Sequence, residues 1–249
     1  MRWIEAKGRL FRDQSRKAPI VIINGDKGGV GKSMTARVIA SLLASACSSI
    51  VCIDADARNG HLERYMEKSM AVLRTNIRLE AGFQAACTAI ENARDEEAVV
   101  MDLPANIGDF IENANERIRR FASAVDRAII HVWVASEEKD SIILFNRVCQ
   151  MAAASQTVFV LNGRFAPALA EFKLWAGSET RKNFLENGGH EIFMPSLPIY
   201  PRTKIMEAQV PFHMSHMAQF DAIEAVDFEM WWENIEHHFE KLITVLEGI

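Results

Sequence analysis

Short apolar runs alternate with segments of helical periodicity along this 249-residue chain. The run from Pro19 to Asn24 is continuously apolar and β-branched, which is typical of a strand buried on both faces. The segment from Ser33 to Ala46 repeats apolar residues at helical spacing. Further strands are expected at Ile50–Ile53, Ala98–Met101, Ala128–Val134 and Thr157–Leu161, and further helices at 82–94, 109–122, 138–153 and 168–186. This alternation predicts an α/β fold with a mostly parallel twisted sheet flanked by helices on both faces.

The last part of the chain predicts one amphipathic helix, at about residues 227–247. Apolar residues from Phe228 to Leu246 follow helical spacing, and they include Trp231 and Trp232. The polar face is acidic, with six acids against one base in residues 227–249. An acidic face disfavours anchoring on an anionic membrane. We therefore expect this helix to pack on the domain or against a partner protein.

Composition and cysteine use exclude several classes of protein. The hydrophobic content of 49% and the charged content of 24% are those of an ordinary globular domain. The four cysteines form no C-x-x-C pair, which favours buried free thiols over a metal site. No apolar run is long enough to span a membrane, and the charged N-terminus lacks the apolar core of a signal peptide. A cytoplasmic protein without membrane insertion is expected.

A glycine-rich loop lies between the first predicted strand and the first predicted helix. It reads G-D-K-G-G-V-G-K-S from Gly25 to Ser33. A strand, such a loop and a helix N-terminus together form a phosphate-binding site, because backbone amides and the helix dipole attract phosphate oxygens. Lys32 is expected to reach the β- and γ-phosphates, and the Ser33 hydroxyl to ligate Mg²⁺. Asp26 stands where the usual pattern has glycine, and it is expected to point away from the phosphates.

The run K-G-G-V-G-K-S resembles the deviant Walker A loop of the ParA/MinD family of ATPases. The resemblance implies that Lys27 is the signature lysine, which reaches across a homodimer to the phosphates of the other subunit's nucleotide. It also implies that ATP holds the two subunits together and that hydrolysis releases them. The implied nucleotide contacts are Gly28, Gly29, Val30, Gly31, Lys32, Ser33 and Met34.

The remaining motifs of the family follow in order. Asp54, after the second strand, resembles the residue that orients the attacking water and lies near the metal, with Asp56 close by. Asp102, after the third strand, resembles the acid that holds a Mg²⁺-bound water. Asn162 resembles the residue that touches adenine, and Pro198 belongs to a late proline loop that frames the base. ATP and Mg²⁺ are the implied cofactors, and the guanine-reading N-K-x-D motif is absent after Asn162.

The resemblance covers roughly residues 18–212. It divides the chain into a basic arm at 1–17, with six bases against two acids, and an ATPase domain at 18–249. Iron–sulfur relatives are excluded because no cysteine pair follows Asp102. Tyrosine-kinase relatives are excluded because the chain has two tyrosines, and MinD itself because this C-terminus is acidic.

Two functions remain open within the family, since a fold does not fix a function. The first is a plasmid or DNA partition, positioning or stability ATPase, similar to the small StbB and TraL types. Its non-specific DNA contacts are expected at Arg117, Arg119, Arg120 and Arg127 and at the N-terminal bases. The second is a nucleotide-gated adaptor with little turnover, which recruits a protein activator or cargo. It would dock through Trp3, Ile4, Leu10 and Phe11, or through Trp231 and Trp232.

Overall fold

A computed structural model describes residues 3, 10–11, 16–25, 27–47, 49–105 and 108–248, with side chains given outside 108–112. Asp26, Ile4 and most of the basic arm lie outside the described residues. The described chain forms one sheet of seven strands in the order β3-β2-β4-β1-β5-β6-β7. Every adjacent pair of strands is parallel. The strands are β1 (Lys17–Asn24), β2 (Ile50–Asp54), β3 (Val72–Arg74), β4 (Ala98–Asp102), β5 (Arg127–Ala135), β6 (Thr157–Asn162) and β7 (His190–Met194).

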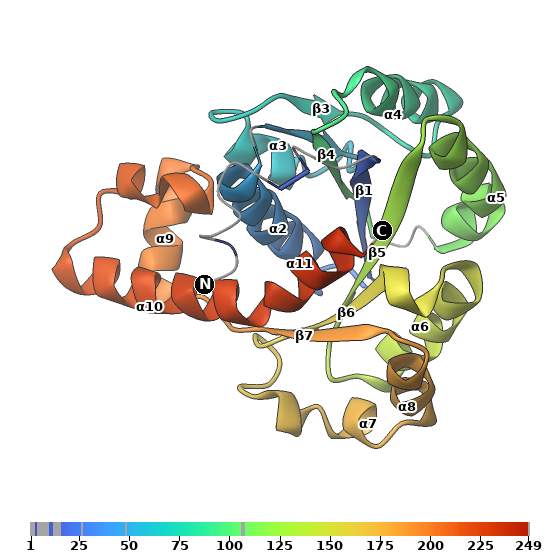
Figure 1. The fold of residues 1–249 in the computed structure, drawn as a ribbon. Coiled ribbons are helices and arrows are strands. Elements are labelled where there is room, and N and C mark those ends of the chain that lie inside the picture. The colour runs from blue at the N-terminus through green and yellow to red at the C-terminus, as the bar shows by residue number, and fades with distance from the viewer. Residues whose placement is uncertain are drawn as a thin grey trace.

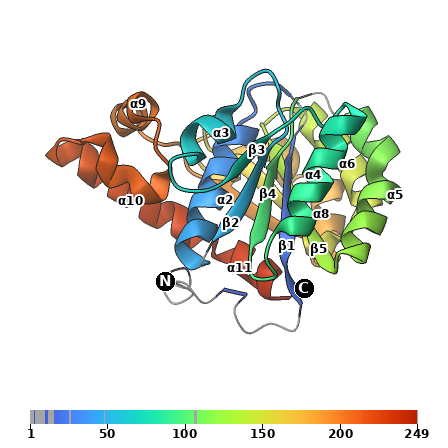
Figure 2. The ribbon, with the colours of Figure 1, turned by 90° about the horizontal axis from the view of Figure 1, so that it is seen from above.

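Helices cover both faces of this sheet (Figures 1 and 2). The α-helices are α2 (Lys32–Ala46), α3 (His61–Met66), α4 (Glu80–Asn92), α5 (Gly108–Ala124), α6 (Lys139–Met151), α7 (Lys173–Ala176), α8 (Glu179–Glu186), α9 (Ile199–Ala208), α10 (Ala222–His238) and α11 (Glu240–Glu247). Three 3-10 helices, η1 (Ala154–Gln156), η2 (Leu169–Glu171) and η3 (Phe212–Ala218), complete the described elements. The predicted α/β fold with a parallel sheet is confirmed.

The strands carry apolar side chains on both faces because both faces are covered. In β1, Val21 and Ile23 join the core beneath α2, α3, α10 and α11. The alternate residues Ile20 and Ile22 pack against α4 and α5 on the other face. A third cluster, between β5, β6 and helices α6 to α8, contains Phe145 and Phe159. The core therefore has two faces separated by the sheet, as strand alternation requires.

Two predicted helices are broken in the structure. The segment 168–186 is divided into η2, α7 and α8. Gly177 ends α7, and the hydroxyl of Ser178 accepts a hydrogen bond from the Arg181 N–H to cap α8. The C-terminal segment is two helices, α10 and α11, which meet at Phe239. Strands β3 and β7 were not predicted.

The aromatic residues expected to dock a partner lie mainly inside the domain. Trp3, Leu10 and Phe11 are all less than 7% exposed and belong to the core cluster beneath α2. Trp231 is also buried, and its Nε1 donates to the carbonyl of Pro195 at 3.0 Å. The prediction that these four side chains dock a partner is wrong, because the fold already buries their apolar surface away from water. The terminal helices pack on the domain, as expected. The four cysteines are free thiols, of which Cys47 and Cys52 are buried and the other two half-buried.

Candidate functional site

The glycine-rich loop joins the carboxyl end of the central strand β1 to the N-terminus of α2. Gly29 and Gly31 have φ of 81° and 106°, a region that disfavours residues with a side chain. Gly31 is also the N-cap of α2, and no side chain caps this helix. The first amides of α2 therefore lack a side-chain acceptor, which suits binding of an anion.

The two lysines of the loop have different surroundings. Lys32 is 7% exposed, and its ammonium donates to the carbonyl of Lys27 at 2.8 Å, across the loop. Lys27 is exposed, and its ammonium forms ion pairs with Glu138, just before α6, and with Asp140 in the first turn of α6. Lys32 lines the cavity described below, whereas Lys27 faces acids of its own chain.

Two carboxylates lie beside the loop because the strands that carry them are neighbours. Asp54 and Asp102 end β2 and β4 and are paired in register. Asp54 is fully buried, and its two oxygens accept the N–H groups of Asp56 and Glu63 at 3.2 and 3.0 Å. Burial raises the pKa of Asp54, although these backbone hydrogen bonds oppose that rise.

Asp102 has the features expected of a carboxylate awaiting a cation. It is 1% exposed, and burial raises its pKa to about 7, opposed by a hydrogen bond with Ser33. Its Oδ1 has no hydrogen-bond partner among the described residues. A buried oxygen without a partner costs free energy, which a bound cation would offset. Mg²⁺ binds oxygen ligands, and a hydroxyl oxygen and a carboxylate oxygen next to a phosphate loop are suitable ones. Ser33 and Asp102 therefore fit this ion.

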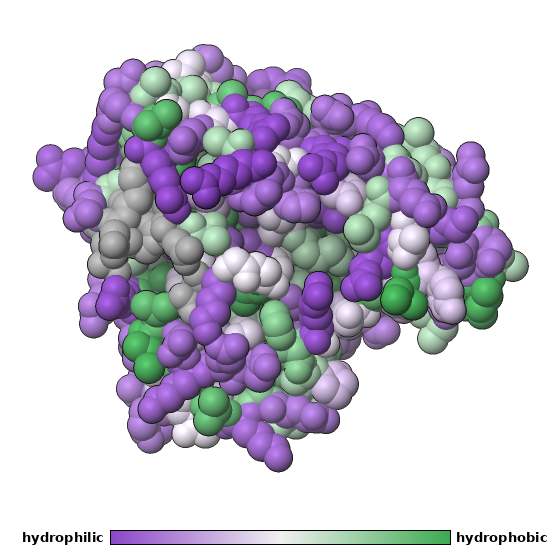
Figure 3. All heavy atoms as spheres, turned by 180° about the vertical axis from the view of Figure 1, so that it is seen from behind, coloured by the Kyte–Doolittle hydropathy of each residue, from purple (hydrophilic) through white to green (hydrophobic). Residues whose placement is uncertain are grey.

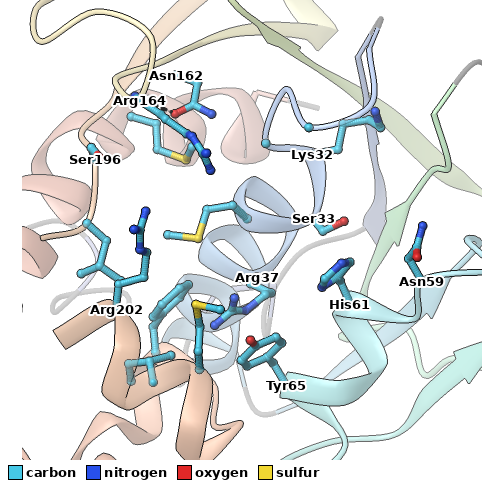
Figure 4. A pocket seen from close by; sticks show the side chains of 18 of the residues that line it. Lys32, Ser33, Arg37, Asn59, His61, Tyr65, Asn162, Arg164, Ser196 and Arg202 are labelled. Carbon is cyan, nitrogen blue, oxygen red and sulfur yellow. Dashed lines mark hydrogen bonds between the residues drawn. The ribbon is translucent and has the colours of Figure 1, made fainter. Parts of the chain in front are cut away.

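A cavity of about 390 Å³ extends from the loop to the carboxyl ends of β6 and β7. Figure 4 shows side chains that line it, with Lys32 and Ser33 at one end and Asn162, Arg164 and Ser196 at the other. Its volume is in the range of pockets that hold small ligands. The remaining lining residues are Gly28, Gly29, Gly31, Met34, Arg37, Asp56, Asn59, His61, Tyr65, Leu103, Ala105, Met194, Pro195, Leu197, Arg202, Ile205, Met206 and Phe212.

Asn162, at the end of β6, connects this strand to the glycine-rich loop by a hydrogen bond. It is 4% exposed, and its Nδ2 donates to the carbonyl of Val30 in the loop at 2.8 Å. Its Oδ1 accepts the N–H of Arg164 at 3.0 Å. Pro198 is the N-cap of α9 and does not line the cavity, whereas Pro195, Ser196 and Leu197 do. The structure therefore brings Asn162 to the loop and leaves Pro198 outside the set of residues that line the cavity.

Several cavity residues were missed by sequence reasoning. Arg37 is the clearest, because it is a lone charge in the otherwise apolar middle of α2, one helical turn after Ser33. That isolation was a signal of a special role. Arg202, Tyr65 and Phe212 come from distant segments, and nothing in their local sequence indicated that they meet.

One of the four arginines expected to contact DNA is buried. Arg127 is 4% exposed and donates four hydrogen bonds of 2.6–2.8 Å to the carbonyls of Ala18, Ala93, Arg94 and Glu97. A guanidinium fully engaged with backbone carbonyls cannot reach a phosphate, so its assignment to DNA is wrong. Arg117 forms two hydrogen bonds with Glu80, and Arg119 and Arg120 pair with Glu116. These three are exposed, and each is paired with an acid, although Arg119 and Arg120 share Glu116.

The geometry agrees with comparisons to known proteins. The family model described as ATPase MipZ matches residues 19–152, which is more than half of the chain and includes the loop, Asp54 and Asp102. The chain belongs to the MipZ ATPase family. Membership makes it a nucleotide-binding P-loop protein of the ParA/MinD type, which confirms the resemblance seen in the sequence.

Individual relatives of this MipZ-family chain are distant. Protein MobD of Acidithiobacillus ferrooxidans is 24% identical over 178 residues, covering 72% of this chain and 78% of that protein. The signal recognition particle receptor FtsY from Elizabethkingia anophelis, solved in complex with GDP, has a TM-score of 0.55 at 14% identity; the match covers 78% of this chain and 62% of that one. A nucleotide-binding protein from Archaeoglobus fulgidus, solved in complex with ADP, has a TM-score of 0.50 at 12% identity and covers 86% and 92%. At these identities the structures show a shared fold.

No helix within the described ranges has the length and apolar character needed to cross a bilayer.

Exposed apolar side chains occur on α9 and α10. Seen from behind, hydrophobic side chains lie among polar ones at the end of the molecule that these two helices form (Figure 3). The large exposed apolar residues of these two helices are Ile199, Tyr200, Met206, Ile223, Val226 and Met230.

Proposed function

We propose that this chain is a Mg²⁺-dependent ATPase that dimerises on binding ATP and serves as a switch in plasmid or DNA partition, positioning or stability. The observation that carries the proposal is the meeting of Ser33 with Asp102 beside the glycine loop, where a buried carboxylate oxygen has no partner among the described residues. A nucleotide triphosphate with its cation would complete this arrangement. Family membership supports the same conclusion.

The residues of the site have separate tasks in this proposal. Lys32 and the amides from Gly28 to Met34 bind the phosphates, and Asp54 positions the attacking water. Ser33 and Asp102 hold Mg²⁺, which supplies charge neutralisation at the β- and γ-phosphates. The base end of the nucleotide lies against Asn162 and the segment that leads to Pro198. Phosphoryl transfer needs positioning and charge neutralisation above all, and these groups supply both.

Lys27 has the cross-subunit task. In the single chain it pairs with Glu138 and Asp140, so its charge is engaged away from the cavity. Exposed ion pairs of this kind contribute little to stability, so they are easily exchanged for a stronger partner. The phosphates of the partner subunit's nucleotide would be such a partner. Dimerisation would then complete the site, and turnover would be slow without it.

A nucleotide-gated adaptor is the second candidate, and a specific observation favours it. The exposed apolar residues on α9 and α10 form a surface that a protein partner can cover. The exposed arginines expected to hold DNA are paired with acids, which weakens a DNA footprint. The adaptor would recruit its partner when nucleotide is bound and would hydrolyse little ATP.

Light scattering separates these candidates. The mass of the protein is measured with Mg²⁺ and either ADP or a slowly hydrolysed ATP analogue, with and without DNA at low salt. A doubled mass with the analogue alone, and a further increase with DNA, supports the partition switch. A doubled mass with the analogue that does not increase further when DNA is added favours the adaptor. A mass that stays monomeric with the analogue would remove the cross-subunit role of Lys27 and leave only nucleotide binding.

A further inference from the structure

Arg37 is a buried cation, and two of its guanidinium nitrogens have no hydrogen-bond acceptor among the described residues. Its guanidinium carbon lies 3.4 Å from the ring centre of Tyr65 and 4.6 Å from that of Phe212. The residue is 8% exposed, and its Nε and Nη2 have no hydrogen-bond partner among the described residues. The rings stabilise the charge through the faces of the guanidinium, but its N–H donors point outward from the edge.

Leaving such donors without acceptors is costly. A buried N–H donor without an acceptor has lost its hydrogen bonds to water, and contact with a ring face does not replace them. Burial lowers the pKa of Arg37 to about 10, so the group still carries its charge at neutral pH. A buried charge of this kind is stabilised when an anion reaches it. Arginine in particular suits an oxyanion, because its planar fork of N–H donors matches two oxygens at once.

The surroundings of Arg37 favour an anion as well. Arg37 lines the same cavity as the glycine loop, and Arg202 and Arg164 line it too. Figure 4 shows Arg37 on α2 and Arg202 on α9 on two sides of one hollow. The only acid that lines this cavity, within the described part of the chain, is Asp56. The cavity therefore has a second cationic region besides the phosphate loop.

The position of Arg37 along α2 defines how far this region lies from the loop. Ser33 and Arg37 are four residues apart on one helix, so they share a face and their Cβ atoms are about 5–6 Å apart. Met34, on the turn between them, lines the same cavity. A nucleotide that is held by the loop and extends over Met34 would bring its ribose next to Arg37. Because Arg37 is buried, a small group inside the cavity can reach it, whereas the flat surface of a protein cannot.

We propose that Arg37, assisted by Arg202, binds a second phosphate group, carried on the ribose of the bound nucleotide or held beside it as free phosphate. This inference rests on the proposed nucleotide site. It adds a ligand class to that site: a nucleoside 5′-phosphate with a further phosphate on its 2′ or 3′ oxygen. Tyr65 and Phe212 hold the guanidinium in place beside the cavity that Arg37 lines.

Calorimetric titration of the unmodified protein tests this directly. The ligands are ATP with Mg²⁺, AMP, adenosine 3′,5′-bisphosphate, adenosine 2′,5′-bisphosphate, and inorganic phosphate added to the ATP-loaded protein. At least one bisphosphate should bind roughly tenfold or more tightly than AMP, since a charge-assisted bidentate contact is added. Saturable binding of phosphate to the ATP-loaded protein, with no gain for the bisphosphates, would instead assign the site to free phosphate.

Variants show whether Arg37 is responsible. Arg37→Met keeps the length and apolar contacts of the side chain, and it should abolish the preference for the bisphosphate or the binding of free phosphate. Arg147→Met is the matched control, since Arg147 is exposed on α6 and does not line the cavity. Arg202→Gln, at a half-buried position, should weaken the same preference several-fold, and it serves if Arg37→Met fails to fold.

Two failures are distinguishable in this experiment. If ATP with Mg²⁺ does not bind, the proposed function fails. If ATP binds but both bisphosphates match AMP and free phosphate does not bind, the nucleotide site stands and the second phosphate site is overturned. A preference that persists in Arg37→Met and Arg202→Gln would also overturn it.

Discussion

At the scale of single residues, the two loop lysines separate binding from assembly. Lys32→Ala should lower the affinity for ATP by at least about tenfold, because a buried charge-assisted contact to the phosphates is lost. Lys27→Ala should keep the affinity within a few-fold, since Lys27 is exposed and faces Glu138. It should, however, lose the increase in mass with the ATP analogue. Calorimetry and light scattering measure the two effects, and an equal loss of affinity in both variants contradicts the division.

Arg127 is predicted to act on stability rather than on DNA. Arg127→Met leaves four buried or partly buried carbonyls without their donor. The free energy of unfolding should fall by about 2–4 kcal/mol, as expected for a broken buried network. Urea denaturation measures it. Arg120→Met, at an exposed position, should change stability by no more than about 0.5 kcal/mol; a similar loss in both variants argues against the network.

The pairing of Asp54 with Asp102 could be anticipated from sequence, and the wall of the cavity could not. Each acid follows a predicted strand, and parallel strands bring their carboxyl ends to one edge of the sheet. The contact of Asn162 with Val30 joins residues 132 positions apart, and that of Lys27 with Glu138 joins residues 111 apart. Local pattern contains no information on such pairs. The roles assigned to the individual site residues remain predictions.

At the scale of elements, the start of α10 is stabilised by a capping box. The carboxylate of Asp221 accepts the N–H of Glu224, and the Glu224 carboxylate accepts the N–H of Asp221, both at 2.9 Å. Asp221→Ala should therefore lower the free energy of unfolding by about 1 kcal/mol. Glu229→Ala, at an exposed position inside the same helix, is the control. Equal unfolding midpoints for Asp221→Ala and the unmodified protein in urea would show that the cap is unimportant.

Strand β7 is attached to α7 and α8 by a buried carboxylate whose contribution depends on pH. Glu191 accepts hydrogen bonds from Arg181 at 2.8 and 2.7 Å and from Trp175 at 3.0 Å. Burial alone would raise the pKa of Glu191, but the bonds from Arg181 and Trp175 outweigh it and the pKa is lowered. The stabilisation is therefore present above the ordinary pKa of glutamate and is lost as the pH falls through the lowered value.

Glu191→Gln tests this sign. The variant should be less stable than the unmodified protein at pH 7, by about 1.5–3 kcal/mol, because hydrogen bonds to a charged group are lost. The difference should shrink as the pH falls through the lowered pKa of Glu191, where the carboxylate becomes protonated. Denaturant unfolding at several pH values measures it. A difference that is constant with pH would mean that the charge of Glu191 contributes nothing.

Long elements with a regular period were predictable, and short or interrupted ones were not. Strand β3 has three residues, too few to show alternation, and β7 begins at His190 and includes Glu191. The charge of Glu191 hides the strand, and its burial is tolerable because Arg181 and Trp175 donate hydrogen bonds to the carboxylate. The apolar residues of 168–186 and of the C-terminal segment keep helical spacing through the points where the helices end. The pattern therefore did not show that a new helix begins after the cap at Ser178, or that α10 ends and α11 begins at Phe239.

At the scale of the whole molecule, nucleotide binding should raise the melting temperature. A ligand at 100 times its Kd stabilises the native state by about 2.7 kcal/mol. In a domain of this size, each kcal/mol raises Tm by about 2–4 °C, so ATP with Mg²⁺ should raise it by about 5–10 °C. Differential scanning calorimetry measures the shift, and Lys32→Ala should reduce it to about half or less at the same ATP concentration. An unchanged Tm at saturating ATP contradicts the proposed site.

The architecture followed from sequence because strand and helix patterns alternate over the whole chain. The surfaces that meet partners did not follow, because charge alone was a poor guide. Arg117, Arg119 and Arg120 form a basic run in the sequence, yet each of them is paired with an acid, Glu80 or Glu116. The acidic terminal segment, in turn, covers the core with α10 and α11.

The place of β1 in the sheet also determines the order in which the protein can be built on the ribosome. Among the described strands this one is synthesised first, yet its neighbours are β4 (Ala98–Asp102) and β5 (Arg127–Ala135). Its backbone groups therefore wait until β5 has been synthesised before both of its edges are paired. Until then, an apolar strand with open edges is a template for wrong pairing with other chains. Nascent chains halted before β5 should accordingly depend on chaperones, whereas chains halted after β5 should do so much less.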